Sequence, residues 1–165
     1  VQVRGFSLAE MGVYATFPYI AMMFIGNGMA WVADSMIQRG ASITRVRKLS
    51  QSLAFGGAAL FLLLLTQTTS PALTVLCITL GLGSLACFAS GMGTNHLDIG
   101  PKYAGVLIGL TNTAATIPGI LAPTITGFIV KFTGDWNMVF YIATAILLVG
   151  MVVWNLFASG KRLFD

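Results

Sequence analysis

The chain has 165 residues, of which 56% are hydrophobic and only 8% are charged, and its formal net charge is +4. Soluble domains carry about 25% charged residues, so this composition excludes an ordinary water-soluble domain. It indicates that most of the surface of the protein faces the lipid of a membrane. The positive charge does not indicate nucleic acid as a partner, because the basic residues lie in short connections and do not gather on one face.

Five apolar stretches are each long enough for a helix that crosses the hydrocarbon core, which takes about 20 residues. The stretches are continuous and do not alternate apolar with polar residues, so they predict helices and not the strands of a closed barrel. The predicted fold class is therefore an all-α polytopic membrane protein. We expect its helices at about 11–33, 49–65, 73–92, 104–130 and 136–156.

The first predicted helix carries Asn27 between two glycines and is followed by Asp34 and Arg39. A buried amide has hydrogen-bonding positions that the helix backbone does not satisfy, so Asn27 is a candidate for a substrate path. Asp34 lies at the helix end, where it can accept from Arg39 or face the N-terminus of another helix. We interpret Asp34 and Arg39 as gate or structural charges; a solvated loop carboxylate is the alternative for Asp34.

The number of polar side chains divides the five predicted helices into two groups. The second and fifth predicted helices are almost wholly apolar, so we expect them to be peripheral, whereas the first, third and fourth are expected to be interior. The third carries Ser84, and the fourth carries Asn112, Thr113 and Thr116, which are the other candidates for a substrate path. The alternative for each hydroxyl is a bond to its own helix backbone or to a neighbouring helix.

The fourth predicted helix contains Pro118 and Pro123, and Gly105 and Gly109 stand at the spacing of a close helix contact. Each proline removes a backbone donor and clashes with the preceding turn. Two interpretations remain open: the prolines only curve the helix, or the helix bends there as a pathway opens and closes.

The stretch GTNHLDIGPKYAG, residues 93–105, holds the single histidine of the chain. A zinc site takes three or four Cys, His or carboxylate ligands, and a catalytic triad takes an activated nucleophile with a base and an orienting group. Residues 93–105 supply neither set, and both cysteines lie inside the third predicted helix. We therefore predict no metal site, no catalytic residue and no enzyme activity.

We expect this stretch to be a short connection between the third and fourth helices. Asp98 would cap the start of the fourth helix, and Asn95 and His96 would satisfy the carbonyls that end the third. Three roles stay open: a hinge or cytoplasmic gate, proton coupling by His96, and contact with the substrate.

The basic residues predict the orientation of the helices. Seven of them follow the first, third and fifth helices, and the two others, Arg4 and Lys131, lie on the opposite side. Cytoplasmic connections carry an excess of Lys and Arg, so the C-terminus is expected in the cytoplasm. We also expect one further helix before Val1, because five helices with an outside start are unusual for a transporter. The seven residues are Arg39, Arg45, Arg47, Lys48, Lys102, Lys161 and Arg162.

The run NHLDIGPKYAGVLIGLTNTAATIPGILAPTITG, residues 95–127, resembles the anion:cation symporter family of the major facilitator superfamily. The segments 17–34, 43–57 and 139–161 resemble the same family in the same order. The resemblance implies that the five helices are helices 8–12 of a twelve-helix fold and that residues 1–165 are part of its C-terminal half. It also implies ion-coupled symport of small organic or inorganic anions, such as phosphate or carboxylates, by alternating access. H⁺ or Na⁺ would be the coupling ion, with no other cofactor.

The family pattern is incomplete in two respects. Ala30 stands where the cytoplasmic signature of the superfamily usually has glycine. The charged residues that the family ties to anion binding and coupling lie mostly in other helices, so the missing N-terminal half is an expected partner and this chain alone is not expected to transport. A transporter of another substrate class and a truncated, non-transporting membrane partner remain alternatives. Plasma membrane, lysosome, vesicle and plastid all remain open as locations.

Overall fold

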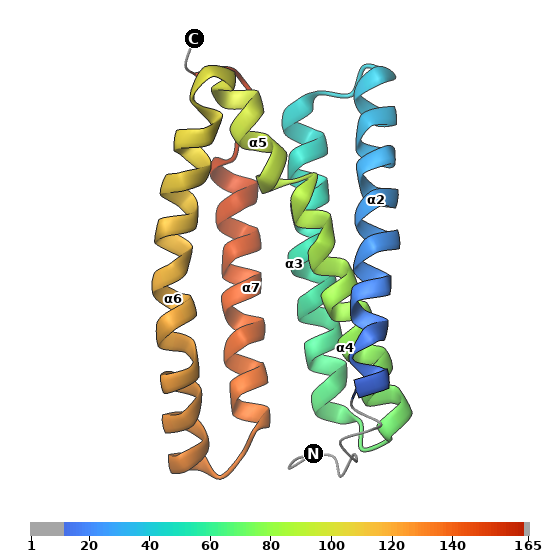
Figure 1. Ribbon diagram of the computed structural model, residues 1–165, viewed down its shortest axis with the longest axis vertical. Coiled ribbons are helices and arrows are strands. Elements are labelled where there is room, and N and C mark those ends of the chain that lie inside the picture. The colour runs from blue at the N-terminus through green and yellow to red at the C-terminus, as the bar shows by residue number, and fades with distance from the viewer. Residues whose placement is uncertain (1–11, 164–165) are drawn as a thin grey trace.

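A computed structural model describes residues 12–163, which form a bundle of long helices without any strand in that range (Figure 1). Five helical spans in this part of the chain are long and apolar enough to cross a membrane. The predicted all-helical membrane fold is therefore confirmed. The elements are α2 (Thr16–Gln38), α3 (Ile43–Gln67), α4 (Pro71–Leu85), η1 (Ala86–Ala89), α5 (Met92–Ile99), η2 (Pro101–Tyr103), α6 (Ala104–Thr133) and α7 (Asn137–Phe157).

Several helices extend beyond the apolar runs that predict them. α3 begins at Ile43 and not near residue 49, because the Ser42 hydroxyl caps it by accepting from the Arg45 amide at 3.3 Å. α6 continues to Thr133 and ends at Gly134, whose φ of 68° is left-handed and whose amide donates to the Val130 carbonyl at 2.9 Å. The predicted bounds are too short because hydropathy detects only the apolar part of a helix. The ends of each helix are set by its capping residues.

The third span is not the single straight helix that we expected at 73–92. α4 ends at Leu85, the chain tightens into η1, and after Ser90 and Gly91 it resumes as α5. The expected connection from residue 93 onward is also wrong, because α5 keeps the chain helical to Ile99. No glycine or proline interrupts residues 94–99, and the helix ends only at Gly100, directly before a proline.

α3 carries the largest buried share of the five described spans and packs against α2, α4 and α7. Small side chains along α3 let these neighbours approach closely. The peripheral position expected for this helix in a complete transporter stays a prediction. Polar residues are buried near its start as well. The buried residues of α3 are Val46, Arg47, Ser50, Gln51, Ala54, Ala58, Ala59 and Leu65.

α6 stands at one side of the bundle beside α7 and contacts α5 and η2 at one end (Figure 1). Ala104 is its one buried residue. A Cβ added at Gly105 or Gly109 would meet no atom within 4 Å, so the close contact expected at these glycines is not made within residues 12–163. α6 therefore presents most of its surface, including the exposed side chains of Asn112, Thr113 and Thr116, away from the rest of the described chain.

Candidate functional site

The connection between α2 and α3, the helix α5 and the segment after α7 meet at one end of the bundle (Figure 1). Two hydrogen bonds join them: the Gly160 amide donates to the Thr44 hydroxyl at 2.9 Å, and the Leu163 amide donates to the Ile99 carbonyl at 2.8 Å. The seven basic residues assigned to one side of the membrane lie on these segments or at their borders. We call this end the basic end.

Asp98 forms a buried ion pair with Arg47 at the basic end. Its Oδ2 lies 2.6 Å from Arg47 Nε and its Oδ1 lies 3.2 Å from Arg47 Nη2, and the two side chains are 7% and 11% exposed, with Arg47 the more buried. The prediction that Asp98 caps the fourth helix is wrong. α5 extends past Asp98 and turns its carboxylate toward α3, where a buried guanidinium needs a compensating charge. The cap positions before η2 and α6 are Gly100 and Tyr103, without a side-chain cap bond.

His96 links α5 to α6. Its Nε2 lies 3.2 Å from the Thr111 hydroxyl oxygen, its Nδ1 lies 3.2 Å from the Gly93 carbonyl oxygen, and the residue is only 9% exposed. The Gly93 carbonyl belongs to the first turn of α5, so His96 does not cap the end of the third span as expected. A side chain held between two helices in this way fixes their separation.

Asn95 is buried beside His96, at 8% exposure, and its side-chain oxygen has no hydrogen-bond partner among the described residues. The expected bond from Asn95 to a carbonyl that ends the third span is not made there, because α5 continues through this position. Its part in a gate stays a prediction.

The hydroxyl candidates of α6 bond to their own helix. Thr113 donates to the Gly109 carbonyl at 2.8 Å, and Thr116 donates to the Asn112 carbonyl at 2.9 Å. The Asn112 side chain is exposed, and no hydrogen bond to it occurs within residues 12–163. Of these three residues, Asn112 therefore has the most hydrogen-bonding capacity left for a solute.

Pro118 and Pro123 both lie inside α6, which is uninterrupted from Ala104 to Thr133. A proline in a helix leaves the carbonyl four residues earlier without its usual donor. Whether α6 bends at these residues during a transport cycle stays a prediction.

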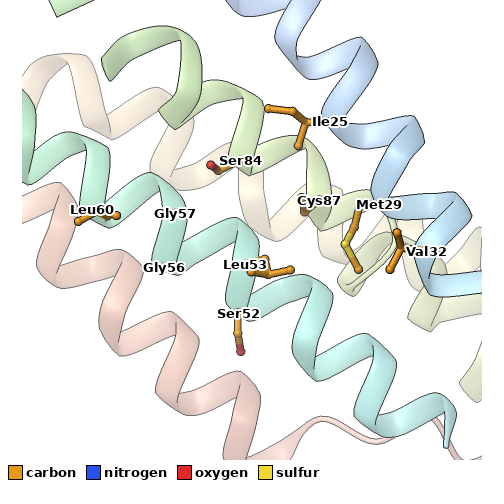
Figure 2. Close-up of a pocket in the computed structure, with 10 residues that line it drawn as sticks. All are labelled: Ile25, Met29, Val32, Ser52, Leu53, Gly56, Gly57, Leu60, Ser84 and Cys87. Carbon is orange, nitrogen blue, oxygen red and sulfur yellow. The ribbon is translucent and has the colours of Figure 1, made fainter. Parts of the chain in front are cut away.

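Asn27 and Ser84 also bond to their own helices. Asn27 Nδ2 donates to the Met23 carbonyl at 2.6 Å, and Ser84 Oγ donates to the Leu80 carbonyl at 2.7 Å. Ser84 lines a cavity of about 580 Å³ between α2, α3 and the α4–η1 segment, and most of the side chains around it are apolar (Figure 2). Asn27 and the α6 candidates do not line this cavity, and α2 and α6 stand on opposite sides of the bundle (Figure 1). The predicted path residues are therefore not gathered in one cavity of this chain.

Asp34 and Arg39 lie at the end of α2 and are both exposed. The expected ion pair between them is not formed: Arg39 is held at this position by its amide, which donates to the Ser35 carbonyl at 3.1 Å. Their role as gate charges stays a prediction.

The sequence did not predict the following three polar contacts, two made by α3 side chains to other segments and one made to α3 by Asn155. Gln51 Oε1 accepts from the Met92 amide at 3.0 Å, Lys48 Nζ donates to the Asn155 carbonyl at 2.6 Å, and Asn155 Nδ2 donates to the Ser52 hydroxyl at 2.7 Å. Their one signal in the sequence is the run of polar residues at 47, 48, 50, 51 and 52, directly before an apolar stretch. No group of three or more His, Cys, Asp or Glu side chains that could hold a metal ion occurs in the described part of the chain.

Comparison with known proteins shows which proteins this chain is similar to. No protein-family model matches the chain. The chain is 45% identical over 164 residues to an ascorbate transporter of the chloroplast from Arabidopsis thaliana, an alignment that covers 99% of this chain and 30% of the relative. It is 44% identical to probable anion transporter 4, chloroplastic, from Oryza sativa subsp. japonica, over 99% of this chain and 28% of the relative. This chain is a relative of the plastid anion transporters.

A third relative, sodium-dependent phosphate transport protein 1, chloroplastic, from Arabidopsis thaliana, is 43% identical over 99% of this chain and 32% of its own length. The resemblance to the anion:cation symporters is thereby confirmed. The five apolar helices and the transporter relatives together identify an integral, multi-pass membrane protein. The chain spans less than a third of the length of these three proteins.

Proposed function

We propose that the full-length protein that contains this chain carries small anions across a membrane by ion-coupled symport and alternating access. The observation that carries the proposal is the alignment of almost the whole chain, at 43–45% identity, with plant transporters named for anions, ascorbate and phosphate. Ascorbate is a small organic anion and phosphate a small inorganic one, so the proposed substrate class is a small organic or inorganic anion. The full-length protein would act as a membrane transporter and not as an enzyme.

The exposed polar side of α6 supports this proposal. A helix that faces only lipid should not carry an exposed amide and several hydroxyls, whereas a helix beside a water-filled path can. Asn112 meets this condition, and Pro118 and Pro123 give α6 places at which to bend. Since α6 contacts little else in this chain, the partner that covers it would be the N-terminal half of the same polypeptide.

The charges of the described residues also favour a second half. Arg47 is neutralised by Asp98, and Lys131 lies in the last turn of α6. No Lys or Arg occupies the middle of any of the five described spans, so an anion here lacks a counter-charge. We infer that these spans are helices 8–12 of a twelve-helix transporter and that the other helices supply the positive charge. The basic end and the C-terminus would face the cytoplasm, and H⁺ or Na⁺ would be the coupling ion.

Uptake by the full-length protein in proteoliposomes tests the proposal. We expect labelled phosphate or ascorbate to accumulate when a Na⁺ or pH gradient is imposed, and accumulation to stop when that gradient is collapsed. Excess unlabelled anion should compete. Uptake of an uncharged sugar without competition by anions would contradict the proposal and support another substrate class.

A further inference from the structure

The third span is interrupted at Ser90 and Gly91, between η1 and α5. Gly91 has φ −91° and ψ −101°, which is not helical, and its amide bonds to Phe88, three residues before it. Such a break leaves backbone carbonyls and amides without partners in their own helix. Inside a membrane bundle each of these groups needs a donor or acceptor from elsewhere.

Two side chains of α3 supply these partners. Arg47 Nη1 donates to the Ser90 carbonyl at 3.0 Å, and Gln51 Oε1 accepts from the Met92 amide at 3.0 Å. Arg47 and Gln51 are four residues apart and so lie on the same face of α3. They are 6% and 1% exposed, which means that little water reaches the break to replace them.

The backbone of the break touches α3 directly. A Cβ added at Gly91 would lie 2.7 Å from Gln51 Oε1 and 2.9 Å from the Gln51 backbone nitrogen. A neighbouring backbone atom cannot move aside as a flexible side chain can, so glycine is required for this approach. The position of α5 is therefore set by contact with α3 as well as by the chain that leads into it.

Contacts continue from α5 into α6. Asp98, near the end of α5, binds Arg47, and His96 lies within hydrogen-bond distance of Thr111 on α6. Thr111 directly precedes Asn112, the exposed amide of the proposed path. Polar side-chain contacts thus join α3 to α5 and α5 to the first third of α6.

We propose that Arg47 and Gln51 are positioning residues that hold α5 against α3 across the break and thereby set the position of α6. At the break, the Ser90 carbonyl and the Met92 amide bond to α3, whereas the Ser90 and Gly91 amides bond within the span and the Ala89 carbonyl accepts from the Thr94 hydroxyl. Rotation of α5 about Gly91 would therefore require the two bonds to α3 to break. The proposal rests on the proposed transport function, because α6 is the helix that would line the path.

Pulsed electron paramagnetic resonance on the full-length protein tests this proposal. Spin labels are placed at Leu64→Cys on α3 and Leu97→Cys on α5, which are 45% and 53% exposed, in a background without other reactive cysteines. We expect one narrow distance in the otherwise unsubstituted protein. Gln51→Met keeps the length of the side chain but removes the amide oxygen, and we expect loss of the narrow distance and of most of the maximal uptake rate.

Gln51→Glu is the matched rescue variant, because its carboxylate also accepts from the Met92 amide. We expect it to restore the narrow distance and the uptake rate. A narrow distance in Gln51→Met, or the same loss in Gln51→Glu as in Gln51→Met, would overturn the proposal.

A second variant combines Arg47→Met with Asp98→Leu, so that no unpaired charge is left to prevent folding. We expect it to lose the narrow distance as Gln51→Met does, whereas Arg45→Gln, an exposed control on the same helix, should keep it. A narrow distance in the double variant would overturn the role of Arg47. If the distances change in the variants as expected but the unsubstituted protein takes up no anion, the proposed transport function is wrong and the positioning role stands. If the unsubstituted protein takes up anions but the variants keep the narrow distance, the positioning role is wrong and the transport function stands.

Discussion

At the scale of single residues, Arg47 and Asp98 show how a charge can lie inside a sparsely charged bundle. Arg47 is 6% exposed, and its guanidinium makes three hydrogen bonds, two to the Asp98 carboxylate and one to the Ser90 carbonyl. Removing two charges from water is costly, so the pair is weak evidence of net stabilisation. Removing one partner alone lowers the stability of the fold, because the other charge then stays buried and uncompensated.

Asp98→Asn is therefore expected to destabilise the protein by about 3 kcal/mol, since it leaves the Arg47 charge unbalanced. The measurement is the free energy of unfolding of the purified protein in detergent. Asp34→Asn is the control: this carboxylate is exposed and unpaired with Arg39, and its change should be within about 0.5 kcal/mol. Equal losses in both variants would contradict a specific role for the buried pair.

His96 touches a carbonyl and a hydroxyl and lies between two helices, which favours a structural link over proton coupling. We expect His96→Gln to lower the maximal uptake rate of the full-length protein but to leave the shape of its pH profile unchanged. Thr111→Val removes the other partner of this contact and should have the same effect. A flattened pH profile in His96→Gln alone would instead show that His96 takes part in proton coupling.

At the scale of elements, the break between η1 and α5 divides the third span into two helical parts. Hydropathy treats residues 71–99 as a single apolar span, because the break contains only Ser90 and Gly91 and no charge. The break exists because α3 comes close enough to satisfy the freed backbone groups. Its cause is therefore twofold: the Ser90-Gly91 pair permits a kink, and the packing of α3 satisfies the groups that the kink frees.

Gly91→Ala is expected to destabilise the protein by about 2 kcal/mol, because the added methyl group meets the backbone of Gln51 and forces α3 and α5 apart. Thermal unfolding followed by circular dichroism measures the effect. The matched control is Gly105→Ala on α6, where the added Cβ meets no atom within 4 Å. This control should be neutral or slightly stabilising, since alanine favours a helix more than glycine does; a neutral Gly91→Ala would show that the contact is loose.

At the scale of the whole molecule, the described spans form two groups, α2, α3 and α4 on one side and α6 and α7 on the other (Figure 1). α3 contacts α7, whereas α6 leaves most of its surface uncovered. A polar helix surface without protein against it is not stable in lipid, so the missing partner is expected from the remaining length of the polypeptide.

This chain expressed alone is expected to insert into a membrane but not to transport. No Lys or Arg lies in the middle of the five described spans for an anion to bind, and α6 is largely uncovered by the rest of the described chain. The measurement is uptake of labelled phosphate into proteoliposomes that contain only this chain, with the full-length protein as the positive control. Gradient-driven uptake by the chain alone would contradict this expectation.

The sequence by itself determined the membrane class, the five spans and the relation to anion transporters. These depend on local properties, because a helix in lipid satisfies its own backbone and its apolar side chains need only the lipid around them. The tertiary structure decided the partner of Asp98, the break at Gly91 and the link from His96 to Thr111. Arg47 and Asp98 are 51 residues apart, and no local pattern favours their pairing over a helix cap. Only the packing of α5 on α3 brings the carboxylate to the buried guanidinium and away from the start of α6.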